Sequence, residues 1–406
     1  MNDKAPKDLA EILAPCGSAE FLRSTFGRTL LVVPGQPGKF SALLPWDSLN
    51  LILRQHRLDS PRLRLFLEGK QVPVSAYLRH APSKRAGQGP IPRLQARELT
   101  DKLREGATLI LDAADELYEP LTRLAESLER TFGEHIQVNA YAGWQSSPGF
   151  DLHWDDHDVL ILQLYGQKKW EVRGPTRLYP LGRDAERNTE RPERAVWEGI
   201  LSDGHLLYIP RGWWHGALPL IEPTLHLTVG IHNRTGVDLL GWLQDEMRSS
   251  ELFRQDLPRF NSAEQRKEHG ARMRSELISR FDDRLIEEYF ESRDARVQPR
   301  AVLGLPFTPT SDLLPPSDDF RVRMASPRSL KFVDEADTAF SFTAASRVWR
   351  FAAPARPLFE LLNSGESLAF NDLADRVGQQ LDRSTLRGLL QELIKEGLAV
   401  LLPINT

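Results

Sequence analysis

The chain has 406 residues, which is too long for one ordinary core, so we expect two or three domains. Hydrophobic residues make up 41% and charged residues 27%, as in a soluble globular protein, and the net charge of -4 argues against a chain that binds polyanions as a whole. The single cysteine, Cys16, excludes an internal disulfide framework and a Cys-rich zinc site.

The N-terminal segment MNDKAPKDLAEILAPCG has no apolar signal core, and no stretch approaches the ~20 apolar residues that span a bilayer. We therefore expect a cytoplasmic protein with no membrane partner. Residues 8–135 mix short helical and strand patterns. Leu121, Leu124, Leu128 and Phe132 recur at helical spacing and predict an amphipathic helix over 118–132.

Residues 136–236 consist of short alternating or fully apolar runs, separated by Gly, Pro and Asn turn signals. Such spacing favours an antiparallel barrel or sandwich. The runs with strand length and composition are IQVNAYA (136–142), DVLILQLYG (158–166), KKWEV (168–172), HLLYIP (205–210) and TLHLTVGIH (224–232).

The rest of the chain divides into three further parts. Apolar stripes at helical spacing over 237–297 predict helices, one with Leu239, Leu240, Leu243 and Met247 and one with Met273, Leu277, Ile278 and Phe281. Prolines and serines at 301–330 indicate a linker. The tail predicts helices at 357–363, 371–378 and 383–396 and a strand at 398–402, an order that resembles a winged helix. The expected divisions are 1–236, 237–300, 301–330 and 331–406.

The segment Leu152-His-Trp-Asp-Asp-His157 carries the most informative chemistry. In an extended strand residues two apart share a face, so His153 and Asp155 project together. The run YIPRGWWHGAL delivers His215 from another strand, which completes the two-histidine, one-carboxylate set of non-haem Fe(II) oxygenases. The alternative is that these histidines are simply hydrogen-bonded, because the pattern His-x-Asp often occurs by chance.

An iron oxygenase needs an electron source, and the sequence has no flavin or nicotinamide fingerprint. A 2-oxo acid would chelate the iron, and its far carboxylate would need a cation. Lys168 shares a strand face with Trp170 and Val172, and a lysine on an apolar face requires an anionic partner or a route to solvent. A lysine at a strand end that reaches solvent is the alternative.

Two further strands supply polar side chains to one face each. Thr228 and His226 alternate with apolar residues in 224–232, and Asn139 and Tyr141 do so in 136–142. Exposure to solvent is the commoner reason for such a face. A barrel that binds a ligand would instead turn both faces inward.

The segments NAYAGWQSSPGFDLHWDDHDVLILQLYGQKKW, LLYIPRGWWHGA and TLHLTVG resemble the JmjC-type 2-oxoglutarate oxygenases, in particular their ribosomal-oxygenase branch. The resemblance implies an α+β fold. Its parts would be a double-stranded β-helix (jelly-roll or cupin) barrel, a helical dimerisation segment over 237–297 that makes a homodimer, and a C-terminal winged-helix domain.

The resemblance also implies roles for single residues. His153, Asp155 and His215 would bind Fe(II), and Lys168 would bind the C5 carboxylate of 2-oxoglutarate, with O2 as the second cosubstrate. Asn139 and Thr228 match positions that line the cosubstrate site. His157 would lie beside the reacting substrate carbon without being a ligand. Trp213 and Tyr141 are further candidates for substrate contact, although core packing is as common for a tryptophan there.

The function implied is hydroxylation of a side chain, Arg or His, of a protein that the family suggests is ribosomal. A ribosomally made natural-product peptide is an alternative substrate, and N-methyl-lysine demethylation is an alternative reaction. A different class is a barrel without activity that only binds a partner. The intact set of His153, Asp155, His215 and Lys168 argues against this class.

Two charged regions bear on the partner. The arginine-rich stretch at 182–194 is either a solvated loop or a clamp for an acidic partner, and it fits poorly with a basic ribosomal protein. Residues 356–406 hold five Lys or Arg and seven Asp or Glu, which gives 5 − 7 = -2. Because binding to phosphates needs positive charge, we expect the tail to contact protein and not nucleic acid.

Overall fold

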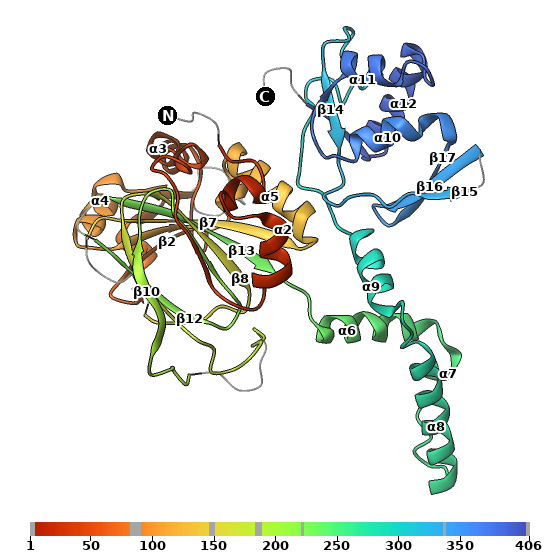
Figure 1. Cartoon of the computed structure of the whole chain (residues 1–406), viewed down its shortest axis with the longest axis horizontal. Helices are drawn as coiled ribbons and strands as arrows, with labels where there is room; N and C mark the ends of the chain where they lie inside the picture. The colour runs from red at the N-terminus through yellow and green to blue at the C-terminus, as the bar shows by residue number, and fades with distance from the viewer. Residues whose placement is uncertain are drawn as a thin grey trace. The chain divides into compact units, whose positions relative to one another are not determined.

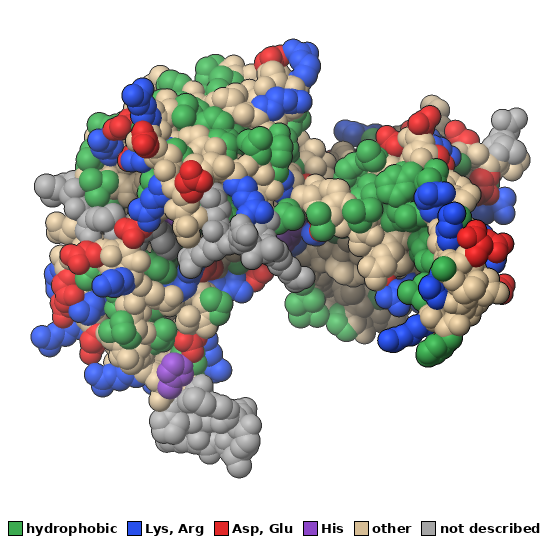
Figure 2. Space-filling view, turned by 90° about the horizontal axis from the view of Figure 1, so that it is seen from below, with side chains coloured by type: hydrophobic (Ala, Val, Ile, Leu, Met, Phe, Trp, Pro, Cys, Tyr) green, Lys and Arg blue, Asp and Glu red, His purple; other side chains and the backbone are tan. Residues whose placement is uncertain are grey.

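The computed structural model describes residues 5–81, 91–145, 151–182, 189–220, 223–335 and 338–402 (Figure 1). The chain forms two compact units, residues 1–233 and 234–406. Within the described residues, none of the helices has the length and apolarity that crossing a bilayer requires. Figure 2 shows Lys or Arg and Asp or Glu side chains interspersed over the visible face, in keeping with the small net charge.

The first unit is built on two antiparallel sheets, and the five runs predicted as strands are confirmed. The larger sheet has the order β1 (Leu31–Val33), β11 (Leu206–Ile209), β8 (Asp158–Tyr165), β13 (Thr224–His232), β7 (His135–Gly143), β6 (Thr108–Leu111), β2 (Leu63–Leu67), β3 (Lys70–Gln71). The smaller sheet has the order β10 (Ala195–Leu201), β9 (Lys168–Arg173), β12 (Trp214–Pro219), and β4 (Leu78–Ala81) pairs with β5 (Ile91–Leu94).

Helices cover one face of the larger sheet, which we call the outer face. Figure 1 shows α3 and α5 on one side of β7, β8 and β13. Alternate residues of these strands, such as Val138, Leu162 and Leu227, are fully buried in the core beneath the helices. The covering helices are α1 (Leu9–Leu13), α2 (Ser18–Glu20), α3 (Trp46–Gln55), α4 (Ala96–Arg104) and α5 (Glu119–Phe132).

Helix α5 confirms the helix predicted over 118–132. Its buried residues include Leu121, Leu124 and Leu128, which are three of the four residues of the predicted stripe. The helix ends at Gly133, whose φ of 68° is a left-handed conformation that glycine adopts without steric cost.

The opposite, inner face of the larger sheet packs against the smaller sheet and closes the barrel. Val159 and Ile161 of β8 meet Trp170 and Val172 of β9 in a second, smaller apolar cluster that also holds Leu207 of β11. The residues that alternate with the outer core therefore point between the two sheets. Polar side chains of this inner face, such as His226 and Gln163, can therefore be buried between the sheets.

The second unit begins with helices α6 (Gly236–Glu246), α7 (Glu251–Arg254), α8 (Ala263–Ser279) and α9 (Leu285–Asp294). The first predicted stripe is partly buried, since Leu243 and Met247 pack with Leu285. The second stripe is not, because Ile278 is 63% exposed and Phe281 50% exposed. The apolar face of α8 is therefore not covered within the described part of this unit.

The C-terminal part of this unit has a core of its own. Its elements are β14 (Arg321–Met324), β15 (Val333–Glu335), β16 (Ala339–Ala344), β17 (Arg347–Ala352), α10 (Arg356–Leu362), β18 (Leu368–Ala369), α11 (Phe370–Val377), α12 (Arg383–Lys395) and β19 (Ala399–Leu402). The tail helices and final strand lie within one or two residues of the predicted ranges.

The linker expected over 301–330 is wrong for the last part of this range. Phe320, Val322 and Met324 are buried in the C-terminal core, and β14 pairs with β18 and β19. Prolines and serines around this strand suggested a linker, while the apolar alternation of residues 320–324 is that of a short half-buried strand. The last part of the range therefore belongs to the folded C-terminal part.

Candidate metal centre and cosubstrate site

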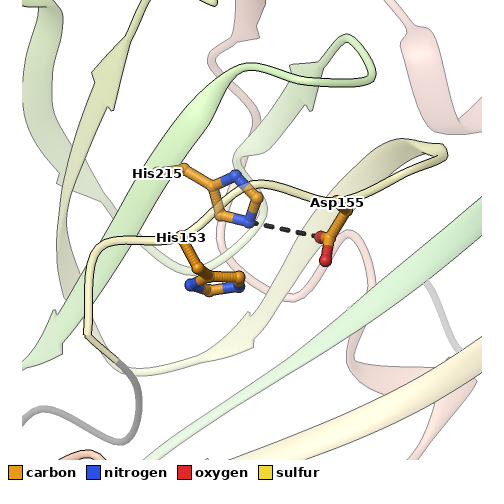
Figure 3. Close-up of side chains that lie close together, drawn as sticks. All are labelled: His153, Asp155 and His215. Carbon is orange, nitrogen blue, oxygen red and sulfur yellow. Dashed lines mark ion pairs between the residues drawn. The ribbon is translucent and has the colours of Figure 1, made fainter. Parts of the chain in front are cut away.

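Three side chains predicted as ligands converge between the two sheets. One nitrogen or oxygen atom from each of His153, Asp155 and His215 lies within 4.8 Å of the other two (Figure 3). Among the described residues this is the group of histidine and acidic side chains able to hold a metal ion, and His157 is not part of it. Two imidazoles and one carboxylate suit a divalent transition metal.

Backbone pairing brings the two histidines together. His153 and His215 form an isolated antiparallel bridge, in which each N–H donates to the carbonyl of the other at 3.1 and 2.7 Å. The amide of Gly212 donates to the carbonyl of Asp155 at 2.9 Å. Residues 151–157 are thus not the regular strand that the sequence suggested, because their ladder with β12 is limited to this bridge.

Both histidines are oriented by a backbone carbonyl at Nδ1. His153 Nδ1 lies 2.8 Å from the carbonyl of Asp151, and His215 Nδ1 lies 3.0 Å from the carbonyl of Trp213. Because a carbonyl only accepts, Nδ1 carries a proton in each ring, and Nε2 is the nitrogen left to bind a metal. His215 Nε2 then faces Asp155 Oδ2 at 3.4 Å. A proton on Nε2 would make this contact an ion pair, and a metal ion would take the place of that proton.

The charges of the group also suit a metal. Burial acts to raise the pKa of Asp155, but the hydrogen bond and the charge of His215 outweigh it and hold that pKa well below its ordinary value. Burial lowers the pKa of His153, with a further contribution from His215. An ionised carboxylate and a neutral imidazole are the protonation states that bind metal.

Lys168 lies on the inner face, as its strand phase predicted. The side chain is 2% exposed, and Trp170 and Val172 beside it are buried, whereas Lys169 is exposed. Burial lowers the pKa of Lys168 to about 7. The described residues offer its ammonium no ion pair with a carboxylate. A buried cation in this state fits the anionic end of a bound ligand.

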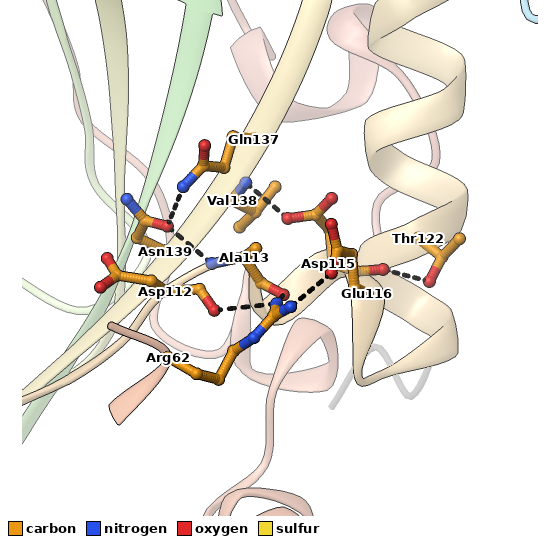
Figure 4. Close-up of polar contacts among 9 residues, drawn as sticks. All are labelled: Arg62, Asp112, Ala113, Asp115, Glu116, Thr122, Gln137, Val138 and Asn139. Atoms are coloured by element: carbon orange, nitrogen blue, oxygen red, sulfur yellow. Dashed lines mark hydrogen bonds and ion pairs between the residues drawn. The ribbon is translucent and has the colours of Figure 1, made fainter. Parts of the chain in front are cut away.

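Asn139 and Thr228 are directly paired across β7 and β13 on the inner face. The Asn139 side-chain oxygen accepts hydrogen bonds from the Ala113 amide at 2.9 Å and from Gln137 Nε2 at 3.0 Å (Figure 4). This carbonyl end is therefore occupied by the protein. Burial raises the pKa of Tyr141, while a hydrogen bond with Asn139 opposes that rise.

The residues expected near the substrate lie in different surroundings. The His157 ring is 4.4 Å from that of His232, and its Nδ1 is 3.0 Å from Asp156 Oδ1. Trp213 packs against the inner apolar cluster while its carbonyl orients His215. Within the arginine-rich stretch 182–194, residues 183–188 lie outside the described residues.

Sequence reasoning missed two kinds of contributor to this site. The carbonyls of Asp151 and Trp213 each lie two residues before the histidine they orient. His226 belongs to the polar alternation of residues 224–232, and it is buried against Tyr141 and Trp170. The alternation of polar and apolar residues in the sequence indicated His226, whereas the position of a backbone carbonyl leaves no trace in a sequence.

Comparison with known proteins agrees with this geometry. Residues 114–239 match the model of the JmjC domain family. This part of the chain is therefore similar to a JmjC domain. The JmjC match spans β7 to β13 and includes the three converging residues and Lys168.

The curated relatives that match this chain include ribosomal oxygenases. It is 29% identical over 228 residues to ribosomal oxygenase 1 of Gallus gallus, which covers 55% of this chain and 36% of the relative. It is 34% identical over 175 residues to ribosomal oxygenase 2 of Rattus norvegicus, covering 41% and 37%. The chain thus matches little more than a third of either relative.

Among solved structures, this chain is similar to YcfD, a ribosomal oxygenase from Escherichia coli, with a TM-score of 0.58 and 17% identity over 96% of this chain and 99% of YcfD. A YcfD structure in complex with cobalt and 2-oxoglutarate gives a TM-score of 0.55 with 18% identity, over 95% of this chain and 98% of that one. At this identity the likeness concerns the fold, which is the cupin-like barrel expected from the sequence.

Proposed function

We propose that this protein is an Fe(II)- and 2-oxoglutarate-dependent oxygenase that hydroxylates a protein side chain. The observation that carries the proposal is the convergence of His215 Nε2 on the Asp155 carboxylate at 3.4 Å, with His153 completing the group. Buried Lys168 on the same inner face supports the choice of a dicarboxylate cosubstrate.

Different residues of the chain would bind the metal and the cosubstrate. His153, Asp155 and His215 would hold the iron, which leaves three of six positions open for cosubstrate and O2. Bound iron supplies the oxidation of 2-oxoglutarate to succinate and carbon dioxide, with one oxygen atom entering a C–H bond. Lys168 would bind the far carboxylate, beside Asn139 and Thr228. The apolar cluster between the sheets keeps bulk water from this end of the site.

We propose arginine or histidine as the hydroxylated residue. Support comes from the names of the relatives, which include a bifunctional lysine-specific demethylase and histidyl-hydroxylase of Caenorhabditis elegans, 26% identical over 226 residues. His157, Trp213 and Tyr141 are the residues that we assign to the substrate side.

We also propose that the protein is a homodimer through residues 237–297. Exposed apolar residues on α8 and α9 support this, since Ile278, Ile286 and Phe290 are 63%, 55% and 42% exposed. A cavity of about 390 Å³ adds apolar surface nearby, and its lining includes Leu240, Met247, Phe253 and Leu277. The winged-helix-like C-terminal part, with its net negative charge, would contact protein and not nucleic acid.

Turnover of 2-oxoglutarate by the full chain with Fe(II) tests the catalytic proposal. We expect succinate formation, and its loss by at least a hundredfold in Asp155→Ala, because the ionised ligand is removed. Glu198→Gln is the control, since Glu198 is an exposed carboxylate on β10 paired with Lys169. Equal turnover by Asp155→Ala and wild type would contradict the proposal.

The substrate is tested separately. Proteins from wild-type cells and from cells lacking this chain are compared by mass spectrometry for the gain of one oxygen atom. We expect the gain on an arginine or histidine of a protein from wild-type cells alone. A gain found only as loss of methyl groups from lysine would favour demethylation instead.

A further inference from the structure

Three buried polar atoms without a hydrogen-bond partner lie on the inner face of the barrel. They are Gln163 Oε1, Trp170 Nε1 and His226 Nδ1. The three residues are 0%, 3% and 3% exposed. Leaving such an atom unpaired is unfavourable, so a cluster of them indicates a group that binds there.

These residues are neighbours of one another and of Lys168. His226 is paired with Gln163 of β8 on one side and with Tyr141 of β7 on the other. The His226 ring stacks on Tyr141 with centroids 4.9 Å apart and planes 5° apart, and it meets the Trp170 ring edge-on at 5.5 Å. Lys168 is two residues from Trp170 on the same face of β9.

The chemistry of the cluster selects an anion. Trp170 Nε1 can only donate, and His226 Nδ1 donates when it carries the ring proton. Burial, together with the charge of Lys168, holds the pKa of His226 well below its ordinary value, so the ring is neutral. Lys168 is therefore the one cation of this cluster. Gln163 Oε1 only accepts and so does not belong to the donor set for an anion.

We propose that His226 and Trp170 are ligand-binding residues that donate Nδ1–H and Nε1–H to the far carboxylate of the 2-oxo acid beside Lys168. The inference rests on the proposed function and names the groups that complete its cosubstrate site. The rigid stack on Tyr141 fixes the His226 ring in place before the ligand arrives. Two neutral donors also allow the carboxylate to be held without a second buried cation.

Calorimetric binding to the Mn²⁺-loaded full chain tests the proposal without measuring activity. The probes are 2-oxoglutarate and 2-oxopentanoate, which lacks the far carboxylate and is measured by competition. We expect His226→Leu to weaken 2-oxoglutarate at least tenfold and 2-oxopentanoate less than threefold. His226→Asn, which can place an amide N–H near the position of Nδ1, should recover most of the loss. Trp170→Phe keeps an aromatic ring but removes Nε1–H, and it should weaken 2-oxoglutarate binding about fivefold.

The outcomes separate this inference from the proposed function. If the wild-type chain binds 2-oxoglutarate and His226→Leu binds it equally well, the inference is wrong while the oxygenase proposal stands. If His226→Leu weakens both 2-oxo acids equally, with unchanged Mn²⁺ affinity, His226 only supports the packing and the inference is also wrong. If the wild-type chain binds neither 2-oxo acid, the proposed function itself fails.

Discussion

The two faces of the larger sheet are made by alternate residues of the same strands, yet they differ in whether their buried polar atoms have hydrogen-bond partners. Leu227 of β13 is buried among apolar side chains of the outer core. Its neighbour His226 is equally buried on the inner face but has a ring nitrogen without a partner. Among the described residues of the sheet, buried polar side-chain atoms without a hydrogen-bond partner therefore lie on the inner face and not on the outer face.

This difference shows how the barrel tolerates a binding site. Burial of apolar area under the helices contributes stability at about 25 cal/mol per Å². The unsatisfied atoms and the buried ammonium of Lys168 act against stability in the ligand-free protein. The outer core therefore offsets the cost of an inner face that is suited to ligands. Substitutions on the two faces should have opposite effects.

Truncation on the outer face should have the largest effect on stability. Leu227→Ala removes a side chain that is 0% exposed and leaves a cavity under the helices. We expect the free energy of unfolding to fall by about 2–5 kcal/mol, measured by chemical denaturation. The affinity for 2-oxoglutarate should stay within threefold of wild type. A large loss of affinity would show that the two faces are not independent.

Removal of the buried charge on the inner face should act in the opposite direction. Lys168→Met keeps the length of the side chain and removes the desolvated ammonium. We expect the free energy of unfolding at pH 7 to rise by about 1–3 kcal/mol, while 2-oxoglutarate binding is lost. Lys169→Met is the control, because Lys169 is exposed on the other side of β9. A less stable Lys168→Met protein would contradict the role given to burial.

The smallest expected effect is the pH dependence of the stability that Lys168→Met gains over the wild-type protein. Lys168 has a pKa of about 7 in the folded chain and an ordinary lysine pKa when unfolded, so between these values the unfolded chain binds the extra proton. The free energy of unfolding of the wild-type protein therefore increases with pH relative to that of Lys168→Met. The advantage of the variant should shrink by about 1–2 kcal/mol between pH 7 and 9 in parallel denaturation curves. A constant difference would mean that Lys168 does not lose its proton in the fold.

Local sequence patterns predicted much of the site because they depend on strand phase. The alternation in KKWEV placed Lys168 inward, and the short spacing of His153 and Asp155 kept them near each other. The bridge between His153 and His215 was not predictable, since it depends on a pairing of distant segments. The unsatisfied nitrogen of His226 was not predictable either, because composition does not tell which polar face a second sheet will cover.

The same limits explain the error at residues 320–324. Turn-forming residues on both sides outweighed the alternation of Phe320, Val322 and Met324, which is too short to be decisive alone. The partners that bury this strand, β18 and β19, come more than forty residues later.

The carbonyls that hold His153 and His215 have a consequence for how the site is loaded. Both imidazoles turn Nε2 towards the site in advance, so an arriving ion finds its ligands without a change of tautomer in either ring. We therefore expect the shedding of hydration water by the ion to be the slow event in metallation. Loading rates for different divalent ions should accordingly follow the speed at which each exchanges water in solution, and the pace would be set by the metal and not by the polypeptide.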